Sequence, residues 1–241
     1  MDRPYIICHM MTSLDGKITG PFMDTQAAGE VGEEYERINR FYAPQAWVNG
    51  RVTIDENFTF GAEPELDPST PAYSREDFAA LVGAESYLVA VDPHGRLGWQ
   101  KNYVEYAGRP KSYVIEVLTE SVSDAYLDFL RRKKISYLFA GSDGLNCTLA
   151  VRKLKKLFGI ERLKLSGGGL VNGAFLQEGL VDELSLLIVP AADGERSTPS
   201  LFERADYLPQ VPPTTFTLKA MEQTKGDGVW LRYLANHTHE K

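Results

Sequence analysis

Short, almost continuously apolar segments alternate along this chain with segments that repeat apolar residues at helical spacing. Runs rich in apolar and β-branched residues are typical of strands covered on both faces, as in a parallel sheet. Because parallel strands need crossover connections, the alternation predicts a layered α/β fold with a mostly parallel sheet. The predicted strands are 5–10, 46–49, 87–91, 112–117, 137–140, 162–166 and 183–189.

Helices are predicted between these strands. Tyr35, Ile38 and Phe41 recur at helical spacing, and Ser74 with Asp77 is similar to a capping box. A further candidate ends in Arg-Arg-Lys-Lys, which suits the partial negative charge at a helix C-terminus. The predicted helices are 32–41, 74–82, 123–134 and 148–158.

The C-terminal part breaks this alternation. Two further predicted strands, 214–223 and 229–233, flank Lys225-Gly226-Asp227-Gly228, whose residue types favour a tight turn. We therefore expect the sheet to end in an antiparallel hairpin. The Pro-rich, acidic stretch 60–71 predicts a surface loop and not a domain boundary. The chain, 1–241, is thus expected to form a single domain with a core over about 4–234.

Charge and cysteine content exclude several classes of protein. Lys and Arg number 26 against 33 Asp and Glu, and the resulting net charge of −7 argues against binding to nucleic acid or an anionic membrane. Cys8 and Cys147 are too few for a disulfide framework and fit no zinc motif, so no metal site is expected. No apolar run approaches the length of a membrane span, and the apolar start lacks a cleavage site, so a cytoplasmic protein is expected.

The most informative segment is the glycine run Gly167-Gly168-Gly169, between a predicted strand and a predicted helix. Glycine lets a ligand approach the main chain closely, and the free N–H groups at a helix start carry a partial positive charge. A phosphate or diphosphate fits there without any basic side chain. A tight turn without a ligand is the alternative, although one glycine usually suffices for a turn. The spacing matches neither the Rossmann fingerprint nor a P-loop.

Two other segments follow predicted strands. Asn49-Gly50-Arg51-Val52-Thr53 offers a cation and a hydroxyl, and Asp15-Gly16 after the first strand predicts a turn. Taken alone, each of them is better explained as an ordinary surface loop or turn.

Together, and in this order, the three segments resemble the riboflavin-biosynthesis pyrimidine reductase family, which shares its fold with dihydrofolate reductase. The likeness extends from about Pro4 to Tyr233. The residues that carry it are Ser13-Leu14-Asp15-Gly16-Lys17-Ile18, Gly50-Arg51-x-Thr53, and Gly167-Gly168-Gly169 followed by Phe175-Leu176-x-x-Gly179-Leu180-Val181-Asp182-Glu183-Leu184 and Pro190.

The resemblance implies a three-layer αβα fold of the dihydrofolate reductase type, NADPH as the cofactor, and a homodimer. It also implies hydride transfer from the nicotinamide to C1 of the opened ribose of a phosphoribosylamino-pyrimidine. The cofactor carries this chemistry, while the protein supplies position and electrostatics. The residues that the resemblance assigns to the cofactor are Met11, Thr53, Asn57, Pro93, Gly167, Gly168, Gly169, Leu170 and Val171.

The substrate residues match the family less well than the cofactor residues do. The resemblance suggests Arg40 as a ligand of substrate phosphate. Arg51 is an alternative, or a partner for the 2′-phosphate of the cofactor, because an arginine fork suits either task. Ser166 stands where the family commonly has a Glu that contacts substrate, and Asn57 stands where it usually has Asp. We therefore expect an NADPH-dependent reductase whose substrate need not be the riboflavin intermediate.

His9 and Asp15 are the candidate catalytic residues. His9 alternates within the first predicted strand; if it faces the pocket it is the natural proton donor near neutral pH, and otherwise it is a buried core histidine. Asp15 is placed to orient substrate or relay a proton, and is explained equally well as a turn residue. The deaminase signature H-x-E with P-C-x-x-C is absent from the sequence.

Two other functions stay open at this point. One is reduction of dihydrofolate or another pterin, which requires an acidic side chain at the pterin ring; the sequence offers no clear equivalent. The other is a non-catalytic NADP-binding protein, which the loss of the family's Glu at Ser166 supports.

Overall fold

The computed structural model describes residues 2–106, 108–206 and 208–236, and it consists of two compact units. Unit 1 comprises the residues up to Pro4 together with Gln45–Leu163. Unit 2 comprises Tyr5–Pro44 together with the residues from Lys164 onward. Neither unit is one continuous stretch of chain, so the sequence does not divide into two consecutive domains. The expected single domain stays a prediction.

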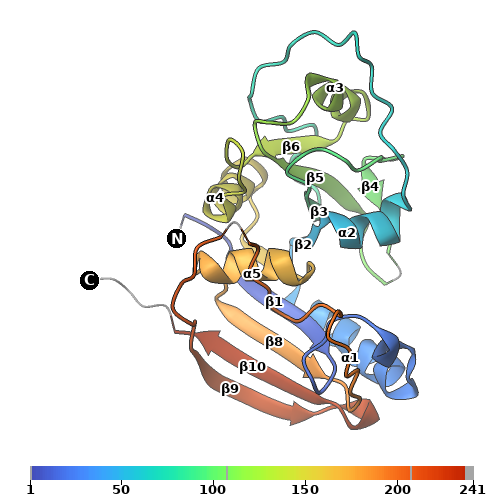
Figure 1. Ribbon diagram of the computed structural model, residues 1–241, viewed down its shortest axis with the longest axis vertical. Coiled ribbons are helices and arrows are strands. Elements are labelled where there is room, and N and C mark those ends of the chain that lie inside the picture. Colours follow the sequence, from blue (N-terminus) through green and yellow to red (C-terminus); the bar gives the residue numbers. More distant parts are fainter. Residues whose placement is uncertain (1, 107, 207, 237–241) are drawn as a thin grey trace. The chain divides into compact units, whose positions relative to one another are not determined.

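Unit 1 is built on a mostly parallel sheet (Figure 1). β2 pairs with β3, β3 with β5, and β5 with β6, all in parallel, while β4 runs antiparallel to the start of β5. The strands are nearly all buried residues, as the continuous apolar runs predicted. Their bounds are β2 (Ala46–Gly50), β3 (Ser86–Val91), β4 (Tyr103–Val104), β5 (Ser112–Leu118) and β6 (Ser136–Phe139).

Helices cover both faces of this sheet. Leu88 and Ala90 of β3 share one buried cluster with Ile54 and Tyr126, which come from α2 and α3. On the other face, Tyr87 of β3 meets the ring of Phe158 in α4 at 5.5 Å between ring centroids. The helices are α2 (Arg51–Ile54), which continues into the π-helical turn η2 (Asp55–Thr59), α3 (Asp124–Arg132) and α4 (Cys147–Phe158).

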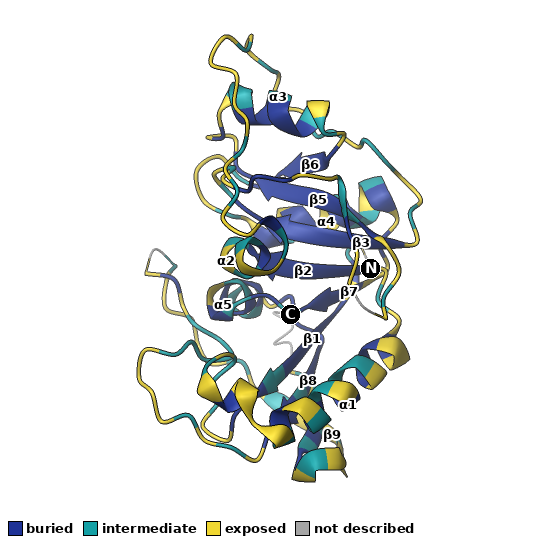
Figure 2. Ribbon diagram, turned by 90° about the vertical axis from the view of Figure 1, so that its right-hand side faces the viewer, coloured by how far each residue is buried: buried dark blue, intermediate teal, exposed yellow. Residues whose placement is uncertain are grey.

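Unit 2 is a smaller sheet in the order β1-β8-β10-β9. β1 and β8 are parallel, and β10 is antiparallel to both β8 and β9. α1 packs on one face, where Ile7, Leu187 and Trp230 form a buried cluster with its apolar side, and Figure 2 shows α5 on the opposite face. The elements are β1 (Tyr5–Thr12), η1 (Pro21–Asp24), α1 (Gln26–Tyr42), α5 (Gly169–Gln177), β8 (Glu183–Ile188), β9 (Phe216–Gln223), η3 (Lys225–Asp227) and β10 (Val229–Ala235); β7 (Arg162–Leu165) contains the division between the units.

The predicted α/β class is confirmed, with a mostly parallel arrangement and an antiparallel hairpin at the C-terminal end. The turn of that hairpin uses Gly226 at φ 68°, a left-handed conformation that glycine adopts without strain. No helix in the described ranges is long and apolar enough to cross a membrane. The cytoplasmic location stays a prediction.

The helix predicted at 74–82 is wrong. The segment instead runs beside β6, where Phe78 forms an isolated bridge with Tyr137. The carboxylate of Asp77 accepts hydrogen bonds from the amide of Phe139 and from Lys153 Nζ, at 2.9 Å each, so it does not cap a helix. Here a long-range partner outweighs the local capping-box signal.

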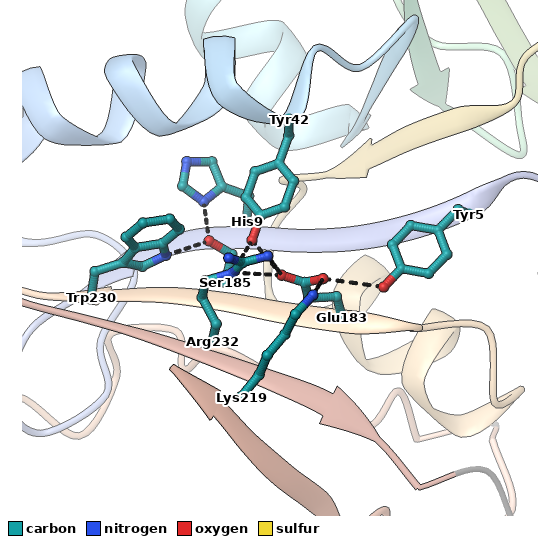
Figure 3. A network of polar contacts seen from close by, with 8 residues as sticks. All are labelled: Tyr5, His9, Tyr42, Glu183, Ser185, Lys219, Trp230 and Arg232. Carbon is teal, nitrogen blue, oxygen red and sulfur yellow. Dashed lines mark hydrogen bonds and ion pairs between the residues drawn. The ribbon is translucent and has the colours of Figure 1, made fainter. Parts of the chain in front are cut away.

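One buried carboxylate ties together the elements of unit 2. Glu183, at the start of β8, is 2% exposed and accepts hydrogen bonds from Tyr42 of α1 at 2.5 Å, Tyr5 of β1 at 3.1 Å and Lys219 of β9 at 3.2 Å. Arg232 of β10 completes the set with an ion pair at 2.8 Å (Figure 3). Each lone pair of the carboxylate is thereby matched to a donor from a different element.

The ionisation state of Glu183 follows from these contacts. Burial alone raises the pKa of a carboxyl, but the hydrogen bonds from Tyr42, Arg232 and Lys219 outweigh it and hold the pKa of Glu183 below its ordinary value. Burial and the neighbouring Glu183 raise the pKa of Tyr5 to about 12. Glu183 is therefore a buried anion with Arg232 as its main counter-ion.

We predict that Glu183→Ala lowers the free energy of unfolding by about 3–5 kcal/mol, because it leaves Arg232 largely buried without its counter-ion. Denaturant unfolding at neutral pH measures the change, and Glu222→Ala on the exposed edge strand is the matched control, expected within about 0.5 kcal/mol of the parent.

Because the pKa of Glu183 is lowered on folding, its stabilisation is present above the ordinary glutamate pKa and is lost as the pH falls through the lowered value. If the difference in the free energy of unfolding between the parent and Glu183→Ala does not shrink in acid, the ionised state of Glu183 is contradicted.

Candidate functional site

In unit 1, three neighbouring parallel strands end at the same edge of the sheet. Gly50, Val91 and Val117 lie side by side in the registers of β2, β3 and β5. The carboxyl edge of a parallel sheet is where α/β proteins most often bind ligands. The predicted residues Arg51, Thr53 and Pro93 all follow these strand ends, so the structure brings them to one edge of unit 1.

The contacts of these residues define what they can do. Arg51 and Thr53 are half-buried in the first turn of α2, and Asn57 is exposed and donates its side-chain amide to the carbonyl of Thr53 at 2.7 Å. The carbonyl of Pro93 accepts hydrogen bonds from the amide and the hydroxyl of Thr119, at 2.9 and 2.8 Å. Pro93 is thus held in place by the end of β5.

The short helix at 51–59 was not predicted from the sequence, which indicated a loop there. The N-cap is Gly50, which makes no side-chain capping bond. The Arg-Val-Thr-Ile-Asp-Glu run has no strong helix signal, because β-branched residues lower helix propensity. Asp55 and Glu56 gave no hint either, because they lie beyond the first turn of the segment, where acidic residues would suit the helix dipole.

In unit 2, the glycine run leads into α5 as predicted. Gly168 is the N-cap and makes no side-chain capping bond, and the first intrahelical bond runs from the amide of Asn172 to the carbonyl of Gly168. The amides of Gly169, Leu170 and Val171 precede that bond and make no hydrogen bond among the contacts of the described chain. Leu170 is 52% exposed. The main-chain donors expected of an anion site are therefore present at the start of α5.

Two glycines of this region have a packing role that the sequence did not reveal. A Cβ at Gly169 would lie 2.5 Å from the carbonyl oxygen of Ser200, and a Cβ at Gly173 would overlap the carbonyl oxygen of Glu203. The amide of Glu203 also bonds the carbonyl of Gly169 at 2.9 Å. Close approach by another part of the chain, and not by a ligand, therefore explains Gly169 and Gly173. The predicted role of Gly167 and Gly168 in binding the cofactor stays a prediction.

Asp15 joins the turn after β1 to the segment that follows β8. Its carboxylate accepts hydrogen bonds from the hydroxyl of Ser13 at 2.6 Å and from the amides of Asp193 and Gly194 at 3.1 and 2.8 Å. These bonds, led by the one from Ser13, hold the pKa of Asp15 far below its ordinary value. Because three donors already engage this carboxylate, the contacts favour the turn interpretation of Asp15 over the catalytic one.

His9 is fully buried on the face of β1 that α1 covers. Its Nδ1 lies 2.9 Å from the hydroxyl of Ser185, its Nε2 lies 3.1 Å from the carbonyl of Tyr35, and its ring stacks on Tyr35 with 4.1 Å between centroids (Figure 3 shows the Ser185 contact). Both ring nitrogens thus have partners inside the core. The predicted role of His9 as a proton donor to substrate does not fit this position, whereas the alternative of a core histidine does.

Arg40 lies at the other end of unit 2 from the predicted cofactor residues. α1 runs back along the sheet, so that Tyr42 near its end bonds Glu183 at the start of β8. The exposed Arg40 therefore lies toward the amino ends of β1 and β8, whereas Met11 lies at their carboxyl ends, opposite Leu187. The predicted role of Arg40 in binding substrate phosphate does not fit this position.

The predicted roles of Met11 and Ser166 stay predictions. Met11 is half-buried near the end of β1, and Ser166 is half-buried directly after β7 and before the glycine run. No group of three or more potential metal ligands gathers anywhere in the described ranges. The carboxyl ends of the parallel strands in each unit thus carry main-chain amides, hydroxyls and one arginine, a set of donors suited to an anionic organic ligand.

Comparison with known proteins identifies relatives of this chain. The sequence profile of the RibD C-terminal domain matches residues 4–229. The 2,5-diamino-6-ribosylamino-4(3H)-pyrimidinone 5′-phosphate reductase of Methanothermobacter thermautotrophicus is 25% identical over 201 residues, which are 83% of this chain and 84% of that protein.

Solved structures share the fold at low sequence identity. A pyrimidine reductase-like protein of Corynebacterium diphtheriae has a TM-score of 0.64 at 15% identity, covering 97% of this chain and 92% of that one. RibD of Acinetobacter baumannii has a TM-score of 0.62 at 19% identity over 98% of this chain. The present chain spans only 59% of the length of that RibD.

We predict that Gly173→Ala destabilises the protein by about 1–3 kcal/mol, because the new methyl group has to displace the backbone at Glu203. The matched control is Gly32→Ala in α1, where nothing lies within 4 Å of the added Cβ. That change is expected to stabilise by about 0.5–1 kcal/mol through helix propensity. Thermal unfolding of both variants measures the difference, and equal effects would contradict the packing role of Gly173.

Proposed function

Because the chain belongs to the family of RibD C-terminal domains, we propose that it is an NADPH-dependent reductase of a phosphoribosylamino-pyrimidine. The observation that carries this proposal is the amino end of α5. There the amides of Gly169, Leu170 and Val171 precede the first intrahelical hydrogen bond and follow directly on Gly167 and Gly168. Such a site binds a diphosphate with the helix dipole and without a basic side chain.

Each unit by itself holds residues that suit one part of such a dinucleotide. We assign the amides of Gly169, Leu170 and Val171, with Gly167 and Gly168, to the diphosphate. Within unit 1, the hydroxyl of Thr53 and the loop at Pro93 are assigned to the adenosine end, and Arg51 to the 2′-phosphate that distinguishes NADPH from NADH. When bound, the cofactor would supply the hydride, and we propose C1 of the opened ribose as its acceptor.

The substrate is the finer part of the proposal. The archaeal relative is named for a 2,5-diamino-6-ribosylamino-pyrimidinone 5′-phosphate, and we propose the same class of substrate here. Ser166 lies at the end of β7, next to the proposed diphosphate site, and donates or accepts one hydrogen bond where the family commonly has a carboxylate.

We further propose that the protein is a homodimer, supported by an apolar face on the C-terminal hairpin. A register shift between Arg232 and Tyr233 brings Leu218 and Met221 of β9 opposite Tyr233 and Leu231 of β10. Leu218 is 52% and Met221 67% exposed, so this face is apolar and open in the described chain. Sedimentation is expected to give a dimer that Met221→Lys dissociates; a monomeric parent protein contradicts the assignment.

The cofactor assignment predicts that Gly168→Asp abolishes NADPH binding. The new carboxylate would occupy the N-cap of α5, where it stabilises the helix and at the same time repels a diphosphate. Titration that follows NADPH fluorescence measures the loss, and thermal unfolding shows that the variant stays folded. The matched control is Gly168→Asn, which has nearly the same shape without the charge and is expected to retain far more affinity.

The outcomes separate the functions considered. If the parent protein does not bind NADPH, both the reductase and the non-catalytic NADP-binding protein are rejected. If it binds and oxidises NADPH with the diaminopyrimidinone ribosyl phosphate, the proposal is supported. If NADPH is oxidised only with dihydrofolate or another pterin, the protein is a pterin reductase. If NADPH binds but is oxidised with neither the pyrimidine nor the pterin substrates, the protein is a non-catalytic NADP-binding protein.

A further inference from the structure

A pair of buried carboxyl groups lies on one face of the unit 1 sheet, beneath the loop that carries Pro93. Glu116 of β5 is 0% exposed and lies opposite Ala90 of β3, and Asp92 is 1% exposed two residues beyond Ala90. Side chains two residues apart in a strand point to the same face. Glu116 and Asp92 are therefore diagonal neighbours, and Glu116 contacts Trp99 and Tyr126 of the buried apolar cluster on this face.

One oxygen of each carboxyl holds the loop from Asp92 to Trp99. Asp92 Oδ2 accepts the amides of Arg96 at 2.5 Å and Leu97 at 2.9 Å. Glu116 Oε1 accepts the indole N–H of Trp99 and lies 3.4 Å from the hydroxyl of Tyr126, which itself donates to the carbonyl of Leu97 at 3.0 Å. The two carboxyls together thus anchor both halves of this loop.

The other oxygen of each carboxyl is buried without a hydrogen bond to the described chain. These atoms are Glu116 Oε2 and Asp92 Oδ1. Two anions placed together in a dry, apolar cluster are strongly unfavourable, whereas one proton turns one unpartnered acceptor into a donor for the other. A single proton shared between the two carboxyls would satisfy both orphaned atoms and remove one of the two charges.

We propose that Glu116 and Asp92 share one proton, and that this proton locks the loop from Asp92 to Trp99 in the shape that presents Pro93 to the cofactor. Glu116 is then a positioning residue, since it acts through Trp99 and Asp92 and touches no ligand. The cofactor part of this inference depends on the function proposed above. The shared proton itself does not.

The charges around the pair agree with this arrangement. Burial and then the charge of Asp92 raise the pKa of Glu116 well above its ordinary value, and burial also raises the pKa of Asp92. Arg51 of α2 and Arg96 of the loop favour the ionised form of Asp92 but are not among the groups that act on Glu116. Tyr126 of α3 faces both carboxyls as a neutral donor, because burial raises its own pKa. The proton therefore resides on Glu116.

The sign of the pH dependence follows. A carboxyl whose pKa is raised on folding binds a proton in the folded state that the unfolded state has released. Stability from this pair is therefore greatest below the ordinary pKa of glutamate and falls as the pH rises toward the raised value. Above it, ionised Glu116 repels Asp92 and the loop loses its anchor. NADPH affinity then falls by up to about tenfold for each further pH unit.

The direct test is the infrared band of a protonated carboxyl in the full-length protein at neutral pH. Glu116→Gln is expected to remove the band, and Glu120→Gln, an exposed neighbour beyond the end of β5, is expected to keep it. Glutamine reproduces protonated Glu116, with an N–H₂ toward Asp92 and a carbonyl toward Trp99. Glu116→Gln should therefore stay folded and lose the decline of stability with rising pH. Absence of the band from the parent protein overturns the proposal.

The second test is the pH profile of the NADPH dissociation constant for the same variants. NADPH binding to the parent protein and to Glu120→Gln is expected to weaken as the pH rises, whereas the dissociation constant of Glu116→Gln is expected to stay constant. In the infrared experiment, Asp92→Asn is expected to shift the midpoint of the carboxyl band to lower pH, because it removes the neighbouring charge. Equal profiles for all variants overturn the positioning role. No binding at any pH, with the carboxyl band present, rejects the proposed cofactor and supports the shared proton.

Discussion

The position of α5 depends on how closely its backbone approaches residues 200–203. Gly169 and Gly173 allow a contact that any side chain would prevent, and the amide of Glu203 closes it with a bond to Gly169. Because this contact fixes the first turn of the helix from one side, the amides of that turn are oriented before any ligand arrives. Pre-orientation of donors is what makes a main-chain anion site effective, since no side-chain entropy is lost on binding.

The two units deal with a buried carboxyl in opposite ways. In unit 2, Glu183 is kept ionised by Arg232, Lys219 and two tyrosine hydroxyls, so charge is matched by charge. In unit 1, Glu116 has no cation among its hydrogen-bond partners, and the indole of Trp99 and the phenol of Tyr126 are its donors. Neutral donors cannot compensate a full buried charge, so the two environments favour different protonation states of the same residue type.

The sequence predicted most strands and the α/β class because continuous apolar runs report burial on both faces directly. It failed at 74–82, where Phe78 pairs with Tyr137 across a long stretch of chain, and at 51–59, where a helix forms from residues of low propensity. For the site, the glycine run and the strand ends were predictable from local patterns. The roles of His9 and Arg40 were not, because the face of a strand and the end of a helix that a residue occupies are set by tertiary packing.

The interleaving of the two units has a consequence for how the protein is made. β1 pairs in parallel with β8, where Ile7 lies opposite Glu183, and β8 comes late in the chain, whereas β2, β3, β5 and β6 lie within one continuous stretch. During synthesis on the ribosome, the first strand therefore emerges long before its neighbour is translated. The main strands of unit 1 have all been translated before β8, the partner of β1, is made. The order of translation thus favours completing the inserted unit first and closing the outer one around the chain's two ends.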